Sequence, residues 1–278
     1  MKYQPSLPSH NDNVSQEHPL KDFLSILSRL AVLALLGFFL LGLLVDTVVD
    51  HMDAATEASL TRIIAAKAPE LPGTPAHGDA RQARLQALAD SMRACAGITG
   101  PATVRLTEST IPNAVVVPGG NIYVFSALLD HVQSENGLAF VLAHELAHLS
   151  HRDHLRSLGR GIVLYGLAAL ISGDTSALAS VLAPVRQLGD ATYSRSRESA
   201  ADARALQVLA CRYGHAGGAT EFFEALDDGK GDVIPGSHYF ASHPAMQARI
   251  AALRAAIAQG GLKTGAVRPF TGFKPGSP

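Results

Sequence analysis

The chain of 278 residues has almost no excess charge and very little cysteine. Its 23 Lys and Arg residues nearly balance its 24 Asp and Glu residues, which gives a net charge of −1 and a pI near 6.9. Because nucleic-acid binding requires a basic face, this balance gives no support for that class of function. Cys95 and Cys211 could form one disulfide, and the sequence does not show whether they meet.

Charged residues are absent from Leu30 to Val45. Sixteen residues as a helix span about 24 Å, and extending the segment to residues 23–49 makes it long enough for a hydrocarbon core of about 30 Å. Lysine and arginine residues precede this segment, and aspartates follow it. We therefore predict a transmembrane signal anchor over residues 23–49, with a cytoplasmic N-terminus and the remainder of the chain outside.

No cysteine follows the apolar run, which argues against a lipoprotein anchor. A cleaved signal peptide is the alternative to an anchor, but no clear cleavage site is present between Asp46 and Asp53. A second apolar region, residues 161–171 and 177–185, is interrupted and too short to cross a membrane as a helix. We predict buried helices of the folded domain there, which could lie against the membrane.

Residues 144–148 are His-Glu-Leu-Ala-His. Positions i and i+4 share one face of a helix, so His144 and His148 can both point a nitrogen at one metal ion. Glu145 lies too far round the helix to ligate that ion comfortably, but it can reach a water bound to it. Two ligands, an open position and a general base are the arrangement of a metalloprotease.

The surrounding residues favour a helix that is buried. Ser134 is a plausible N-cap, and Leu138, Leu142 and Leu146 continue an apolar stripe along one face. Glu145 falls between this stripe and the two histidines. Because burying an unpaired carboxylate is costly, its position indicates a partner or a function.

A catalytic zinc usually takes three protein ligands, and two candidates exist for the third. His154 completes a metzincin spacing, but His151 stands where that spacing requires glycine for a sharp turn. Nothing in the sequence before His154 predicts the end of the helix. We therefore predict that His151 and His154 are outer residues of the site or solvated.

The second candidate is Glu198, which lies four residues before Asp202 in another amphipathic pattern. Glu198 could supply a carboxylate oxygen to the metal. Asp202, one turn further, could accept a hydrogen bond from the far nitrogen of a ligating histidine, which fixes the tautomer of that ligand. Small residues at 199–201 would allow this helix to pack closely on the first.

Together these motifs resemble the M48 family of zinc metallopeptidases, a gluzincin family that includes bacterial heat-shock membrane proteases, Ste24-type proteases and Oma1-type proteases. Two further segments carry the resemblance, Asn113–Phe125 and Ser242-His243-Pro244 followed by Arg249. The similarity covers residues 80 to 258. It implies that His144, His148 and Glu198 hold one zinc ion and that Glu145 is the general base.

The resemblance also implies roles for the two further segments. Asn113–Phe125 is predicted to be a hairpin, with its turn at Pro118-Gly119-Gly120, and an extended polypeptide substrate would bind near Asn121–Val124. His243 would lie near the metal as a catalytic or resting-state residue, and Asp202 would assist catalysis. The implied substrates are misfolded or unassembled membrane and envelope proteins.

The predicted fold is α+β, a mainly helical zincin-type metallopeptidase domain with a small sheet, preceded by one transmembrane helix. We expect a disordered cytoplasmic N-terminus over 1–22, the anchor over 23–49, the peptidase domain over 50–258 and a flexible tail over 259–278. The expected location is the bacterial inner membrane, with the catalytic domain in the periplasm. The competing hypothesis is a membrane-tethered chaperone or scaffold with a non-catalytic zinc site.

Overall fold

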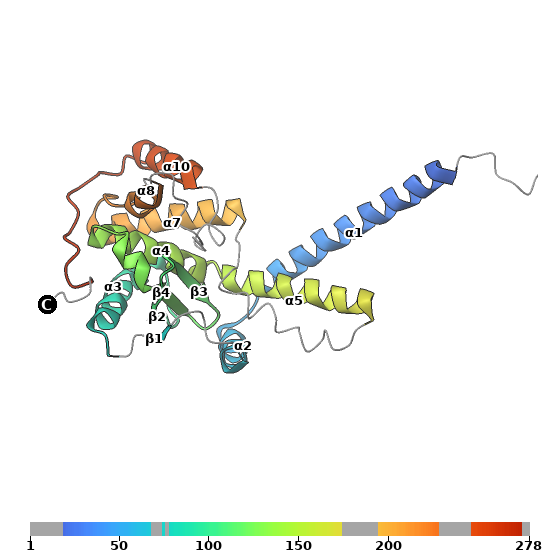
Figure 1. Cartoon of the computed structure of the whole chain (residues 1–278), viewed down its shortest axis with the longest axis horizontal. Helices are drawn as coiled ribbons and strands as arrows, with labels where there is room; N and C mark the ends of the chain where they lie inside the picture. Colours follow the sequence, from blue (N-terminus) through green and yellow to red (C-terminus); the bar gives the residue numbers. More distant parts are fainter. Residues whose placement is uncertain (1–18, 68–73, 76–77, 174–193, 228–245, 274–278) are drawn as a thin grey trace, which may run out of the picture. The chain divides into compact units, whose positions relative to one another are not determined.

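The computed structural model describes residues 19–67, 74–75, 78–173, 194–227 and 246–273. The chain divides into two compact units, residues 1–46 and 47–278. The fold is mainly helical with one small sheet, as predicted (Figure 1). The elements in order are α1 (Pro19–Asp50), α2 (Ala54–Lys67), β1 (Thr74–Pro75), α3 (Ala80–Ala96), β2 (Thr103–Glu108), β3 (Ala114–Val117), β4 (Asn121–Phe125), η1 (Ser126–Asp130), α4 (Glu135–Ser150), α5 (Asp153–Ser172), α7 (Arg195–Tyr213), α8 (Glu221–Asp227) and α10 (Met246–Gln259).

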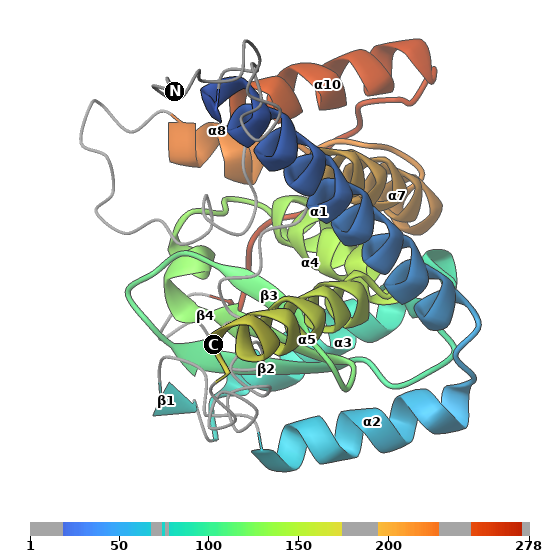
Figure 2. The same ribbon diagram turned by 90° about the vertical axis from the view of Figure 1, so that its right-hand side faces the viewer.

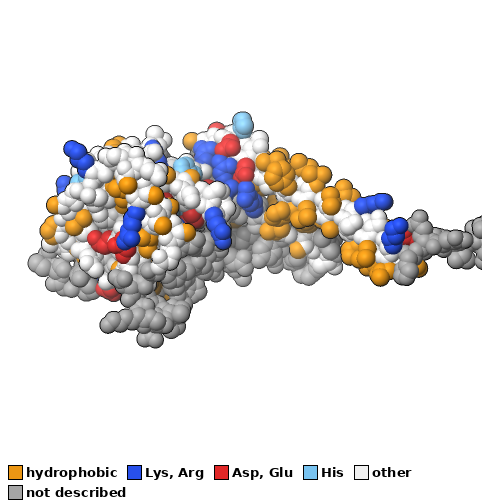
Figure 3. Space-filling model, turned by 90° about the horizontal axis from the view of Figure 1, so that it is seen from above, with side chains coloured by type: hydrophobic (Ala, Val, Ile, Leu, Met, Phe, Trp, Pro, Cys, Tyr) orange, Lys and Arg blue, Asp and Glu red, His pale blue; other side chains and the backbone are white. Residues whose placement is uncertain are grey.

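Helix α1 is 32 residues long and contains the uncharged run predicted to span a membrane. Its large apolar side chains are mostly exposed, with Leu35 reaching 69%, and hydrophobic side chains cover its visible side (Figure 3). Within the described part of the chain, α1 is the one helix long and apolar enough to cross a bilayer.

The sheet has the strand order β1-β2-β4-β3. Strands β2 and β4 pair in parallel, whereas β3 and β4 form the antiparallel hairpin predicted from the sequence. At the hairpin turn Gly119 and Gly120 have φ of 111° and 67°, values that L side chains rarely adopt. A Cβ at Gly120 would also lie 2.1 Å from the carbonyl oxygen of Pro101. The turn therefore requires glycine at this position.

Strand β4 lies inside the sheet, between β2 and β3, so a substrate near Asn121–Val124 could not pair with β4 itself. The outer strand on this side of the sheet is β3, whose residues 114–116 are buried. The Phe125 amide donates to the Asn113 carbonyl at 2.9 Å, so in the alternating antiparallel ladder Ala114 and Val116 point their N–H and C=O groups away from β4. The sequence predicted the hairpin but not which of its strands ends the sheet.

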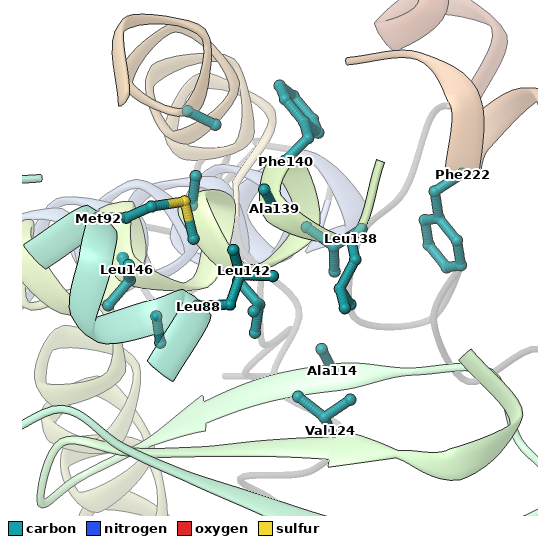
Figure 4. Close-up of a cluster of buried hydrophobic side chains, with 14 of the residues drawn as sticks. Leu88, Met92, Ala114, Val124, Leu138, Ala139, Phe140, Leu142, Leu146 and Phe222 are labelled. Carbon is teal, nitrogen blue, oxygen red and sulfur yellow. The ribbon is translucent and has the colours of Figure 1, made fainter. Parts of the chain in front are cut away.

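Helix α4 lies between the sheet and α7 (Figures 1 and 2). All of its residues from Asn136 to Leu149 are buried, and Ser134 caps its N-terminus by accepting a 3.0 Å hydrogen bond from the Gly137 amide, as predicted. Figure 4 shows its leucine stripe between α3 and the sheet. The core side chains drawn there include Leu88, Met92, Ala114, Val124, Leu138, Leu142 and Leu146.

The helix that begins at Glu135 does not continue to His154, so that expectation is wrong. It ends at Ser150, and Arg152 adopts a left-handed conformation with φ 55° and ψ 29° before α5 begins. Glycine is the usual residue in the left-handed position that ends a helix. Here an arginine occupies the left-handed position, and its side chain is held by other contacts described below.

The prediction of a buried helix over residues 161–171 is also wrong. This segment is the second half of α5, where Ile162, Leu164 and Leu167 are 36%, 46% and 43% exposed. The apolar pattern predicted the helix correctly, but this half of α5 extends away from the sheet and α4 (Figure 1). Residues 177–185 lie outside the described residues.

The segment after α10 was predicted to be a flexible tail over 259–278, yet residues 260–273 lie against the domain. The Glu135 amide donates to the Arg268 carbonyl at 3.1 Å, and the Arg268 amide donates to the Asn136 side chain at 2.8 Å. Phe270 stacks on Phe273, which is only 5% exposed. The glycine, proline and lysine content of this segment suggested flexibility, but Phe270 and Phe273 hold it against the domain.

A disulfide joins Cys95 on α3 to Cys211 on α7. The sequence left this pairing open, because residues 116 positions apart could be placed together only by the packing of α3 against α7.

Candidate active site

Three buried donor residues converge where α4 meets α7. His144 Nε2 lies 3.0 Å from His148 Nε2, and Glu198 brings its Oε1 to 3.3 Å from His148 Nε2 and its Oε2 to 3.5 Å from His144 Nε2. The three residues are at most 2% exposed. Among the described residues, they form a group whose ligand atoms all lie within 4.8 Å of one another.

The spacing of these atoms fits a tetrahedral zinc site. Two donors at about 2.0–2.1 Å from one zinc ion in tetrahedral geometry lie about 3.3 Å apart. The two imidazole nitrogens are 3.0 Å apart, and the two oxygens of Glu198 lie 3.3 and 3.5 Å from one nitrogen each, which are separations close to that value. Two imidazoles and one carboxylate also leave a fourth position open, which is the donor set of a catalytic rather than a closed structural site.

The far nitrogen of His144 contacts Asp202, as the sequence predicted. His144 Nδ1 lies 3.0 Å from Asp202 Oδ1. Burial alone would raise the pKa of Asp202, but hydrogen bonds to His144 and Arg249 lower it to about 2. Burial and the Arg249 charge lower the pKa of His144, yet Asp202 and Glu198 outweigh them and raise it to about 9.

The far nitrogen of His148 contacts a carboxylate that the sequence analysis missed. His148 Nδ1 lies 2.9 Å from Asp153 Oδ2, and Asp153 is 3% exposed. The other Asp153 oxygen lies 3.5 Å from Arg197 Nε. No spacing rule could have found this pair, because it depends on the left-handed residue between α4 and α5.

Arg249 contacts both Asp202 and the predicted metal ligand Glu198. Its Nε and Nη2 donate to the two Asp202 oxygens at 2.8 and 2.6 Å, and its Nη1 lies 3.0 Å from Glu198 Oε2. The guanidinium sits 4.5 Å above the Phe223 ring and is 6% exposed. The sequence singled out Arg249 as part of a motif but gave it no position.

Glu145 lies beside the three donors and next to the sheet edge. Its Oε2 accepts a 3.0 Å hydrogen bond from the Val116 amide, one of the β3 groups that point away from β4. Glu145 is fully buried, and this burial raises its pKa above the ordinary value for a glutamate. A raised pKa makes a carboxylate a better proton acceptor, as general-base catalysis requires.

A model of peptidase family M48 matches residues 79–257, which is more than half of the chain. This chain belongs to peptidase family M48. The match includes α4 and α7 and therefore all three donor residues and Glu145. The protein is thus an M48 metallopeptidase with a buried His144, His148 and Glu198 metal site.

Its sequence is similar to metalloendopeptidases of mitochondria and bacteria. Mitochondrial metalloendopeptidase OMA1 of Schizosaccharomyces pombe is 30% identical over 148 residues, covering 50% of this chain and 42% of that protein. The putative beta-barrel assembly-enhancing protease of Vibrio cholerae is 32% identical over 129 residues, covering 42% and 26%. The beta-barrel assembly-enhancing protease of Escherichia coli is 32% identical over 110 residues, covering 35% of this chain and 22% of that protein. The matched part spans less than half the length of each relative.

The remaining histidines of the sequence analysis are not part of this M48 metal group. His151 is partly exposed, whereas His154 is 1% exposed, and burial lowers its pKa to about 4. His243 lies outside the described residues, so its role near the metal stays a prediction. Of the small residues 199–201, only Ala201 is buried against the core.

Proposed function

We propose that this M48 peptidase is a zinc-dependent endopeptidase that cleaves misfolded or unassembled membrane and envelope proteins. One zinc ion per chain would be held by His144, His148 and Glu198. The observation that carries the proposal is Glu145, a fully buried carboxylate beside three converging donors. A purely structural zinc site has no use for a base at that position and would usually close with a fourth Cys or His.

The chain's own residues supply the proton transfers. Zinc, when bound, acts as a Lewis acid that lowers the pKa of water and polarises the scissile carbonyl. Glu145 takes a proton from the attacking water and delivers it to the leaving amine. Asp202 and Asp153 hold the two imidazoles through their Nδ1 atoms, so that both Nε2 atoms stay directed at the same point. His243 is a further catalytic candidate by family resemblance.

We propose that substrate binds near Asn121–Val124 by pairing with β3, the edge strand next to them. The outward N–H and C=O groups of Ala114 and Val116 lie at this edge, and Glu145 already contacts the Val116 amide. An extended polypeptide pairing there would place a peptide bond beside Glu145. Main-chain pairing depends little on side-chain identity, which suits a protease for unfolded segments.

We further propose that residues 23–49 anchor the protein in the bacterial inner membrane, with residues 1–22 in the cytoplasm. The folded domain would then extend from residue 50 to residue 273 in the periplasm. The Cys95–Cys211 disulfide supports this side of the membrane, because disulfides persist in oxidising compartments. The similarity to proteases named for enhancing beta-barrel assembly supports a role in envelope quality control.

Hydrolysis of casein by the purified full-length chain in detergent tests the proposal. We expect cleavage that a chelator abolishes and that added zinc restores. Glu145→Gln keeps the size of the side chain and the metal ligands but removes the base, so kcat should fall about 10²- to 10⁴-fold with zinc still bound. Glu224→Gln, a glutamate on α8 outside the metal site, is the matched control and should retain activity.

The two hypotheses from the sequence give opposite results in this assay. If the wild type binds zinc but cleaves no unfolded protein or peptide, and Glu145→Gln is indistinguishable from it, the chaperone or scaffold hypothesis is correct. A wild type that cleaves equally well after complete removal of metal would contradict the zinc mechanism.

A further inference from the structure

The contact between His148 and Asp153 cannot form in a continuous helix. Asp153 is five residues after His148, which places it about 140° further round a regular α-helix and therefore on a different face. In the structure the two side chains meet at 2.9 Å because α4 stops at Ser150 and α5 starts in a new direction. The break between the helices is what gives His148 a hydrogen-bond partner.

Arg152 forms this break in a conformation that is unfavourable for its residue type. It is the one non-glycine residue with positive φ among the described residues. A left-handed arginine persists only where its surroundings fix it, because Cβ crowds the backbone in this region. Its carbonyl accepts from the Leu155 and Arg156 amides at 3.0 and 3.2 Å, so the same residue also starts α5.

The segment from Val49 to Glu57 holds the Arg152 side chain. Nη1 donates to the carbonyl oxygens of Val49 and Met52, both at 2.9 Å. Nη2 lies 2.9 Å from Glu57 Oε2. One turn further along α5, Arg156 pairs with Asp50. These contacts tie the break between α4 and α5 to the residues that directly follow the apolar run of α1.

We propose that Asp153 is a positioning residue for the metal ligand His148, and that residues 49–57 keep it in place through Arg152. The Asp153 carboxylate accepts a hydrogen bond from Nδ1, which fixes the tautomer of His148 and directs its Nε2 lone pair toward Glu198 and His144. The peptide segment next to the predicted anchor thereby takes part in the geometry of the metal site. The inference rests on the proposed function, since it assigns roles around the same metal.

Zinc affinity, measured by chelator competition on the full-length chain, tests the role of Asp153. We expect Asp153→Ala to weaken zinc binding about 10- to 100-fold. Asp153→Asn, which retains an acceptor oxygen, should recover most of this loss. In cobalt-substituted protein the visible spectrum of Asp153→Ala should also differ from that of the wild type, a change that mere loss of stability would not produce in the folded fraction.

Two substitutions of Arg152 separate its backbone from its side chain. Arg152→Gly favours the left-handed conformation but removes the side-chain contacts to residues 49–57. Arg152→Ala removes the same contacts and also disfavours the left-handed conformation. We expect Arg152→Gly to weaken zinc binding about 3- to 10-fold and Arg152→Ala to weaken it further. Glu57→Gln, which removes one charge and leaves the two carbonyl contacts, should have the smallest effect.

The possible results distinguish this inference from the proposed function. Wild-type affinity and an unchanged cobalt spectrum in folded Asp153→Ala would overturn the role of Asp153. Wild-type affinity in Arg152→Gly would overturn the role of residues 49–57. A wild-type chain that binds zinc but hydrolyses nothing would refute the proposed function while leaving the affinity comparison intact.

Discussion

The two histidines of the metal site are positioned by aspartates from different helices, α7 for His144 and α5 for His148. His144 contacts Asp202 on α7, and the buried Arg249 donates two hydrogen bonds to the same aspartate. His148 contacts Asp153, which comes from the chain just beyond its own helix and has the partly exposed Arg197 as its cation. One support belongs to the core, and the other depends on a break between two helices.

This difference matters for how the site tolerates change. On the α7 side, Arg249 and Asp202 form a buried ion pair that would leave an unbalanced charge if either partner were lost. On the α5 side, Asp153 is buried too, but its cation is partly exposed and lies further away, at 3.5 Å, so loss of this contact should cost less. We therefore expect changes on the α7 side to affect folding, and changes on the α5 side to affect mainly the metal.

The largest expected effect is that of Asp202→Ala. It leaves the Arg249 guanidinium buried without its two-oxygen partner, so the free energy of unfolding should fall by about 3–5 kcal/mol, measured in urea on metal-free protein. Adding Arg249→Met should recover part of this loss, because the buried guanidinium that lost its two-oxygen partner is then gone. Asp153→Ala should cost clearly less, and equal losses for the two aspartates would contradict the comparison.

The disulfide gives the next effect, again on the α7 side. Cys95→Ala with Cys211→Ala should lower the free energy of unfolding by about 2–4 kcal/mol, because the unfolded chain gains freedom. Zinc affinity of the folded variant should be unchanged, since Cys211 follows Glu198 by more than three helical turns. A large loss of zinc affinity would show that α7 needs this link to position its ligand.

The smallest of the three effects concerns His154, next to Asp153 on α5, and it depends on pH. Burial lowers the pKa of His154 from 6.5 to about 4. Between these values the unfolded chain binds a proton that the folded chain does not, so stability decreases as the pH falls from 6.5 to 4. At pH 5 this amounts to about 2 kcal/mol.

Replacing His154 with leucine tests that assignment. Urea unfolding at pH 7 and pH 5 should show that His154→Leu loses about 2 kcal/mol less than the wild type over this interval. Any fixed packing cost of leucine cancels, because each protein is compared with itself. Identical pH dependence in the two proteins would mean that His154 is accessible to protons in the folded state.

The comparison also shows what the sequence could and could not predict. The α7 side was predictable because Glu198 and Asp202 are four residues apart on one helix, and helical periodicity puts both on the face toward α4. The α5 side was not, because Arg152 carries no mark of a left-handed residue and its partners are about a hundred positions earlier in the chain. Periodicity describes regular elements, whereas breaks between them depend on tertiary contacts.

Other errors have the same origin. The hairpin was predicted from its residues, but the choice of β3 as the edge strand depends on the pairing of β4 with β2, a contact between separate segments. The segment 260–273 was expected to be flexible because its composition is rich in glycine, although Phe270 and Phe273 anchor it. The overall composition of a segment does not show that one or two aromatic side chains can hold it against the domain.

The zinc content of purified protein is the most direct test of the central claim that α7 completes a metal site begun on α4. After gel filtration in zinc-free buffer, the wild type and Glu145→Gln should each retain about one zinc per chain, as expected for a single three-ligand site. Folded Glu198→Ala should retain little or none. If Glu198→Ala holds as much zinc as the wild type, the carboxylate of α7 is not a ligand and the proposed site is wrong.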